Sequence, residues 1–218
     1  MQTTAYVPEL NVDAAGASVE RAIASSDWRA RLPVLDATGV TLRELQPSDA
    51  VSLFGMLANE DVARFVSPPP ATVEGFERFI DWTHRERAAG RSVCFGIVPQ
   101  GQQAAIGLIQ ARALEPRWGT AEWGFAMGSP YWGSGIFPDS ARAVMTFMIE
   151  KVGVHRLEAR ATVSSGRGNG ALEKLGAVQE GILRKSFARR GQYFDQVLWS
   201  IVEDQSYRTK AIWGSRVH

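Results

Sequence analysis

The sequence has a single cysteine, Cys94, in 218 residues. No disulfide can form within the chain, which favours a reducing, cytoplasmic setting. Cys94 lies in the apolar run SVCFGIV, which indicates a small buried side chain. No apolar run approaches the ~18 residues of a membrane-spanning helix, and the first residues lack the basic start and apolar core of a signal peptide. The sequence therefore predicts a cytoplasmic protein with no membrane partner.

The chain also lacks an excess of either charge, with 24 Lys and Arg against 23 Asp and Glu and a net charge of +1. A protein that coats nucleic acid is more basic, so we expect no direct nucleic-acid binding. The three histidines, His84, His155 and His218, are scattered without ligand spacing, so no metal site is predicted.

Hydrophobic periodicity divides the chain into strands and helices, with Gly and Pro at their ends. This order predicts an α/β (α+β) domain with a mixed sheet and helices on both faces. We predict two short strands within 32–45, helices at 47–57 and 72–90, strands at 92–98, 104–114 and 119–127, a helix at 136–152, a strand at 155–163, a short helix at 171–176 and a hairpin of strands at 177–188 and 192–202.

The ends of the chain differ in composition from this middle part. Residues 1–31 are rich in Ala, Ser and Thr and are predicted to form an N-terminal arm, 32–204 the domain, and 205–218 a polar, basic tail anchored by Trp213. An arm and a tail of this kind often wrap a neighbouring subunit, which favours a homodimer.

The stretch YWGSGIFPDS, Tyr131 to Ser140, combines a glycine-rich turn with the start of a helix. The first N–H groups of a helix have no partner and carry partial positive charge, so such a turn can bind an anion. A purely structural turn is the alternative. The motif is neither GxxxxGK[ST] nor G-x-G-x-x-G, whose third glycine would fall on Pro138. Between residues 154 and 192, eight Lys or Arg stand against three Glu, which favours a phosphate-bearing ligand over a merely solvated basic face.

These motifs, in this order, resemble the GNAT acetyltransferases, most closely the ribosomal-protein N-terminal (Rim-type) branch. The resemblance covers about 32–204 and is carried by VTLRELQPSDA, TAEWGFAM, WGSGI, HRLEARATV, NGALEKLGAVQEGILRKSF and DQVLWSIVED. It implies the GNAT fold: a mixed, mostly antiparallel sheet of six to seven strands, with a V-shaped split between the fourth and fifth core strands. It also implies acetyl-CoA as cosubstrate, bound in that split.

The resemblance further implies which residues bind the cofactor. Phe125, Ala126 and Met127 would pair through their backbone with the pantetheine arm. The pyrophosphate loop would be formed by Trp132, Gly133, Ser134, Gly135, Ile136 and Phe137, and Asn169 and Lys174 are added as cofactor-binding candidates. Phe137 stands where the family has a small residue, so its ring has to point into the core. Pro138 lacks an N–H but is tolerated in the first turn of a helix.

The resemblance assigns the catalytic residues only in part. Glu122 resembles a glutamate that many Rim-type enzymes carry, and it is the expected general base for the amine; a salt-bridged strand carboxylate is the alternative. Leu172 stands where many GNAT enzymes have a tyrosine as general acid, so that role has no assigned residue. Ser165 is the first candidate for it, with a turn residue bonded to its own backbone as the alternative, and Tyr193 is a weaker one.

The resemblance implies an enzyme that moves an acetyl group from acetyl-CoA to a primary amine, by direct transfer in a ternary complex. The acceptor is either a protein N-terminal α-amine or a small-molecule amine, and its specificity is expected in the first two helices and near 192–195. The alternative is a CoA-binding sensor or scaffold without turnover, which Leu172 and the Phe137–Pro138 pair motivate.

Overall fold

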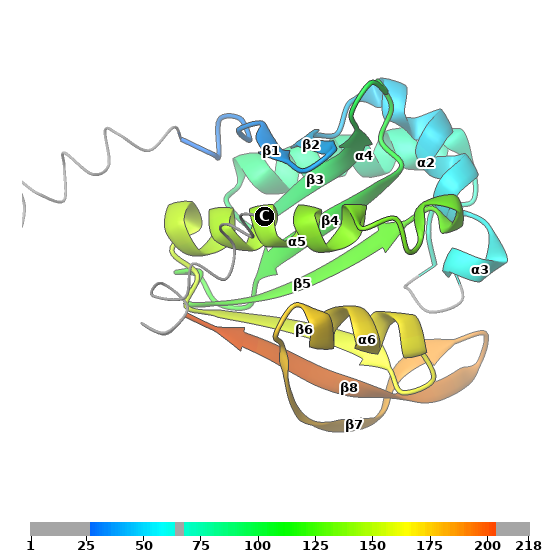
Figure 1. Ribbon diagram of the computed structural model, residues 1–218, viewed down its shortest axis with the longest axis vertical. Coiled ribbons are helices and arrows are strands. Elements are labelled where there is room, and N and C mark those ends of the chain that lie inside the picture. The colour runs from blue at the N-terminus through cyan, green and yellow to red at the C-terminus, as the bar shows by residue number, and fades with distance from the viewer. Residues whose placement is uncertain (1–26, 64–67, 204–218) are drawn as a thin grey trace, which may run out of the picture.

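The computed structural model describes residues 27–63 and 68–203, which form one eight-stranded sheet covered by helices (Figure 1). The strand order is β1-β2-β3-β4-β5-β6-β8-β7, and all neighbours are antiparallel except β5 and β6. The predicted arm up to residue 26, and the tail with Trp213, lie outside the described residues.

The strands are β1 (Leu35–Ala37), β2 (Val40–Glu44), β3 (Ser92–Pro99), β4 (Gly107–Ala113), β5 (Thr120–Met127), β6 (Arg156–Thr162), β7 (Val178–Arg189) and β8 (Gln192–Val202). The helices are α2 (Ala50–Leu57), α3 (Glu60–Ala63), α4 (Val73–Ala88), α5 (Ile136–Phe147) and α6 (Gly166–Lys174). Short 3₁₀ turns precede α2 at Pro47–Asp49 and α5 at Ser129–Tyr131, and a π turn at Met148–Val152 continues α5.

The predicted fold class and the order of the predicted elements are confirmed, with four differences. Helix α3 is an additional element that was not predicted. The sheet has eight strands where six to seven were expected. Strand β4 begins at Gly107 rather than 104, because the N–H of Ala105 donates to the Asp49 carboxylate. Helix α6 begins at Gly166 rather than 171, because Ser165 caps it and holds the glycine-rich stretch in the helix.

Two apolar clusters lie on the two faces of the sheet. The cluster beneath α5 and α6 includes Phe95 and Phe147, whose ring centroids are 5.3 Å apart. The cluster beneath α2 and α4 includes Phe76 and Cys94. Neighbouring strand residues such as Cys94 and Phe95 therefore point to opposite faces, and the prediction of a buried Cys94 is confirmed, since it is 2% exposed.

Asp49 anchors the start of α2 to the sheet. It is fully buried, and its carboxylate accepts two hydrogen bonds from Arg43, at 2.7 and 2.9 Å, and one from each of the N–H groups of Gln46 and Ala105. Burial raises the pKa of this carboxyl, but the bonds from Arg43 and from the two backbone groups outweigh it and hold the pKa below its usual value.

The sheet is split between β5 and β6. The two strands pair only over Thr120–Arg156, Ala121–Leu157 and Glu122–Glu158, whereas β6 continues to pair with β8 as far as Thr162. Beyond Glu122 the two strands diverge, which confirms a V-shaped split (Figure 1); it lies between the fifth and sixth strands of the chain, whereas the fourth and fifth core strands were expected. Because the chain passes from the end of β5 into the loop before α5, the open end of the split lies next to the start of that helix.

Candidate active site

The loop between β5 and α5 is shaped by two glycines with left-handed backbone. Gly133 has φ 79° and Gly135, the N-cap of α5, has φ 86°, a region that favours glycine. A Cβ built at either position meets no atom within 4 Å, so the space beside both is open. Within the described residues, neither N–H donates to a protein acceptor. The loop therefore offers free donors and room for an anion at a helix N-terminus.

Phe137 leaves this space open because its ring points into the core. It is 8% exposed, and its ring centroid lies 4.1 Å from that of Phe125. The expectation that Phe137 turns its ring inward is thus confirmed.

The backbone of β5 presents alternate residues to the split. Gly128 donates its N–H to Ile106, on the β4 side, at 2.9 Å. Successive residues of a strand direct their N–H and C=O groups to opposite edges. The N–H and C=O of Ala126 therefore also face β4, while those of Phe125 and Met127 face the split. Ala126 is therefore poorly placed to pair with a ligand there. The carbonyl of Met127 already accepts from the indole N–H of Trp132, at 2.9 Å.

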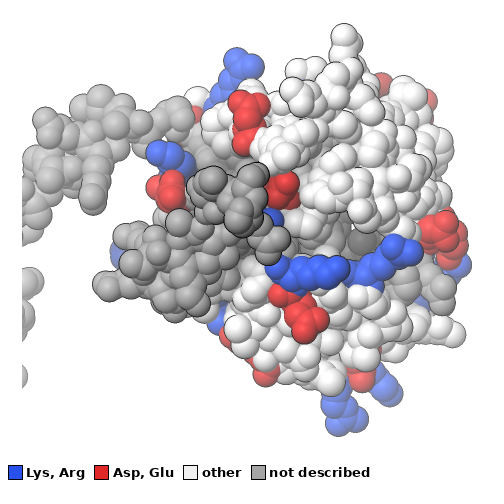
Figure 2. Space-filling model, viewed as in Figure 1, with Lys and Arg blue, Asp and Glu red and all other residues white. Residues whose placement is uncertain are grey.

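Trp132 connects the loop to α6 across the split. The guanidinium carbon of Arg167, in the first turn of α6, lies 4.7 Å from the centre of its ring, a cation–π contact. In Figure 2 a row of Lys and Arg side chains runs between α5 and α6. Lys174, exposed at the end of α6, is a further cation of that helix. Arg167 was not among the predicted site residues, because nothing in the sequence shows that it stacks on Trp132.

Glu122 sits at the point where the split opens. Its side chain is 19% exposed and pairs with Arg112 and, at 3.6 Å, with Arg160. It lies on the sheet face of Ala126, opposite to α5, because residues two apart share a face. The structure thus shows the alternative foreseen for Glu122, a salt-bridged carboxylate, beside the site; its role as base stays a prediction.

Ser165 and Asn169 both have structural bonds. Ser165 is 5% exposed, and its hydroxyl accepts from the N–H of Gly168 at 3.3 Å as the cap of α6. Asn169 donates to the carbonyls of Thr162 and Ser165, both at 2.9 Å, and accepts from Trp199. Their predicted roles stay predictions. Leu172 is 1% exposed in the core.

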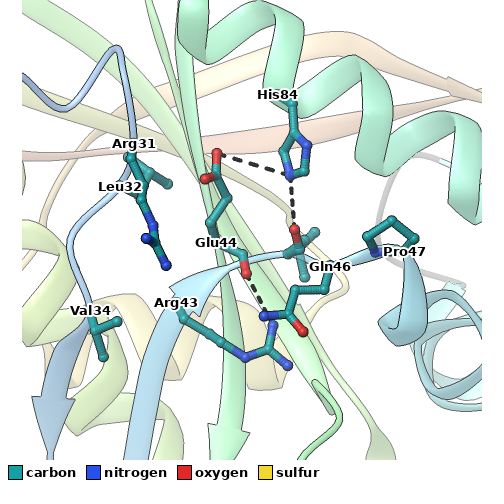
Figure 3. A pocket seen from close by; sticks show the side chains of 9 residues that line it. Arg31, Leu32, Val34, Arg43, Glu44, Gln46, Pro47 and His84 are labelled. Carbon is teal, nitrogen blue, oxygen red and sulfur yellow. Dashed lines mark hydrogen bonds and ion pairs between the residues drawn. The ribbon is translucent and has the colours of Figure 1, made fainter.

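Two further cavities border other parts of the described residues. One, of about 220 Å³, is bordered by residues 31–34, the end of β2 and α4 (Figure 3). Three of its polar side chains already have partners: Arg43 bonds Asp49, Glu44 pairs with Arg87, and His84 bonds the carbonyl of Leu45 at 2.8 Å. The other, between α3 and the β7–β8 hairpin, lies at the end of β6 and includes Gln192 and Phe194, from the hairpin stretch where acceptor specificity was expected.

In residues 27–63 and 68–203, no three His, Cys, Asp or Glu side chains gather to hold a metal ion. No helix in the same ranges is long and apolar enough to cross a membrane.

Known proteins share this architecture. The chain is 25% identical over 174 residues to the uncharacterized N-acetyltransferase YoaA of Bacillus subtilis, covering 78% of this chain and 97% of that protein. Two solved structures share the fold. RimL, a ribosomal L7/L12 alpha-N-protein acetyltransferase in complex with CoA, has a TM-score of 0.72 and 18% identity, over 79% of this chain and 99% of that one. The ribosomal-protein-S5-alanine acetyltransferase of Vibrio fischeri has a TM-score of 0.70 and 20% identity, over 79% and 97%.

The family model of the acetyltransferase (GNAT) domain matches residues 40–178, from β2 to the first residue of β7. That range holds the split, the glycine loop and Glu122, and it exceeds half of the chain. The chain therefore belongs to the GNAT acetyltransferase family and is an acyltransferase.

Proposed function

We propose that this protein transfers an acetyl group from acetyl-CoA to a primary amine. The observation that carries the proposal is the open glycine cradle at the N-terminus of α5, beside a sheet that splits at Glu122. A pyrophosphate needs several converging N–H donors without side chains in front of them. Gly133 and Gly135 meet that need, and the inward ring of Phe137 keeps the space clear.

Each part of the cofactor has suitable groups in the chain. The loop from Trp132 to Phe137 would hold the pyrophosphate, with Arg167 and Lys174 as nearby cations. The carbonyl of Phe125 and the N–H of Met127 would pair with the pantetheine amides, as an added strand does. Acetyl-CoA supplies the acetyl group, whose carbonyl carbon bonds the amine nitrogen as the carbon–sulfur bond breaks.

Glu122 is proposed to accept the proton that the amine has to lose. A free ammonium, with a reference pKa of about 10 for a lysine-type amine, cannot attack a carbonyl, so a base near the split is needed. The N–H of Phe125 faces the same opening and is proposed to stabilise the negative charge that develops on the carbonyl oxygen. Ser165 remains the proposed proton donor to the leaving sulfur, although it also caps α6.

Transfer is proposed to be direct, within a ternary complex. Cys94, the single cysteine, lies in β3 under α2 and α4, and burial, together with the negative charge of Glu44, raises the pKa of its thiol well above its usual range. It is unsuited to forming an acyl-enzyme.

For the acceptor, we propose a protein N-terminal α-amine or a small-molecule amine. RimL and the Vibrio fischeri enzyme are named as acetyltransferases of ribosomal proteins, which supports including N-terminal peptides among the acceptors to be tried. We also propose a cytoplasmic location, a domain spanning 32–204 and a homodimer.

Thiol release from acetyl-CoA, measured over a panel of N-terminal peptides and small amines, tests the function. Glu122→Gln should lower kcat with little change in CoA affinity. Glu158→Gln, the same change at the paired position of β6, is the matched control and should retain activity. Tight CoA binding with no thiol release from any acceptor would favour the sensor or scaffold instead, and an unchanged rate in Glu122→Gln would remove Glu122 from the mechanism.

A further inference from the structure

The cavity between α3 and the β7–β8 hairpin has a volume of about 280 Å³. Figure 1 shows α3 and the tip of the hairpin at the same edge of the molecule, and Arg189 joins them by a hydrogen bond to the carbonyl of Ala63. The third wall is Thr162, the last residue of β6, on the strand that borders the split. The cavity therefore lies beside the open end of the split, and this inference rests on the function proposed above.

Thr162 brings an unsatisfied polar group to this cavity. The residue is 3% exposed, and its hydroxyl oxygen has no hydrogen-bond partner among the described residues. A buried hydroxyl without a partner destabilises the fold, and such groups are uncommon in native proteins. A hydroxyl can both donate and accept, so it can bond the amine or an amide of a ligand.

The cavity also carries a net positive charge, from two arginines and one carboxylate. Glu60 pairs with Arg190 at 3.1 Å, whereas its distance to Arg189 is 4.0 Å. The side chain of Arg189 is 11% exposed, while that of Arg190 is 73% exposed. Arg189 is thus a mostly buried cation whose nearest carboxylate is chiefly engaged elsewhere. A buried guanidinium is best satisfied by a carboxylate that it can bind with two parallel hydrogen bonds.

The rings of Phe187 and Phe194, with centroids 6.4 Å apart, give the cavity an apolar wall, and the polar residues Ser164 and Gln192 complete its lining. A volume of about 280 Å³ is slightly below the ~300 Å³ at which drug-sized pockets begin. It suits one or two residues of a peptide. A polyamine would bring several positive charges next to two arginines.

Acceptor specificity near 192–195 is already expected; we propose that, in this cavity, Arg189 selects acceptor amines with a carboxylate close by, as in an amino acid or an acidic peptide terminus. Thr162 bonds the acceptor next to the split, and the carboxylate bonds Arg189. Polyamines and aminoglycosides are rejected by charge.

The test compares acceptors that differ only in charge. The full chain with acetyl-CoA is assayed for thiol release on three peptides with Glu, Gln or Lys after an N-terminal Ala, and on free glutamate and spermidine. We expect kcat/KM to fall at least about tenfold from Glu to Gln, to fall further for Lys, and to be negligible for spermidine. The ratio of the kcat/KM values for free glutamate and for the Glu peptide shows whether the carboxylate comes from an amino acid or a peptide.

Two variants locate the effect. Arg189→Gln should bring the ratio of kcat/KM for the Glu peptide to that for the Gln peptide close to one. The change should lie in the KM of the acceptor, with the KM of acetyl-CoA unchanged. Arg184→Gln, at an exposed arginine of the same hairpin, is the matched control and should keep the ratio. Thr162→Val should raise the KM of all acceptors without lowering Tm, since it removes an unsatisfied hydroxyl. Should Arg189→Gln fail to fold, Arg189→Lys keeps the charge but loses the planar fork, and should lower the ratio.

The outcomes separate this inference from the enzyme function. Equal kcat/KM for the Glu and Lys peptides, or a ratio that Arg189→Gln leaves unchanged, overturns the inference and leaves an acetyltransferase. If no acceptor releases thiol, the proposed function fails. Calorimetric titration of the peptides into CoA-loaded protein then still decides on the cavity, because tighter binding of the Glu peptide, lost in Arg189→Gln, supports it and equal binding of the three overturns it.

Discussion

Replacing Gly135 by alanine separates the backbone role of this residue from its role toward a ligand. At φ 86° an alanine is strained by about 1–2 kcal/mol, so the free energy of unfolding should fall by that amount. The added methyl group meets no protein atom within 4 Å, so packing adds no further cost. The methyl group stands instead where the pyrophosphate is proposed to bind.

Losing one hydrogen bond to a charged group weakens binding by about 1.5–3 kcal/mol, which corresponds to a CoA Kd about 10- to 150-fold higher. Gly153→Ala is the matched control. Gly153 has φ 87° and equally open surroundings, but it follows the π turn at the far end of α5. Urea unfolding and calorimetry with CoA measure the two effects. We expect equal losses of stability and a loss of affinity in Gly135→Ala alone. Similar CoA affinity in both variants would refute the placement of the cofactor.

Three other perturbations follow from the same structure. Trp132→Leu removes an indole hydrogen bond and a cation–π contact, together worth about 1.5–2 kcal/mol, so calorimetry should show a CoA Kd about 10- to 30-fold higher; unchanged affinity contradicts the contact across the split. Asp49→Asn leaves the guanidinium of Arg43 without its carboxylate and should lower the free energy of unfolding by about 3–5 kcal/mol in urea; a loss below 1 kcal/mol would mean that the pair acts like a surface one. Hydrogen bonds from Arg156 and the Ser200 hydroxyl lower the pKa of Glu180 to about 2, so the stability it contributes is present above pH 4.5 and is lost as the pH falls toward 2; Glu180→Gln should flatten the Tm curve in that window, and an identical slope argues against the shift.

Local sequence signals were sufficient to predict most helices and strands and the glycine loop. The helix predicted at 72–90 begins with Thr72, and the hydroxyl of this residue accepts from the N–H of Gly75 at 3.0 Å as the N-cap of α4. The inward ring of Phe137 also followed from a local argument, since a glycine cradle with a bulky neighbour works only if that neighbour packs inside. Such features depend on residues a few positions apart.

The hairpin side of the cavity beside the split was expected near 192–195, but its closure by α3 could not be found from local signals. Arg189 and Ala63, which close it, are 126 residues apart in the chain. Helix α3 has four residues, too few to show a periodic pattern. Likewise, Arg167 looked like any exposed arginine until the fold placed it over Trp132. Contacts between distant elements are set by tertiary packing, on which hydrophobic periodicity is silent.

The short β5–β6 ladder has a consequence for the lifetime of the protein. In the sheet, three residue pairs join a half with β1 to β5 to a half with β6 to β8, beside the apolar cluster that both halves share, so this ladder is a candidate site of local opening. A cofactor bonded to both edges of the V would tie the halves together and add stability that grows with the logarithm of its concentration. Proteases act on open forms. The amount of this protein that survives in a cell would then follow the supply of its cofactor, and the split would make protein turnover responsive to metabolism.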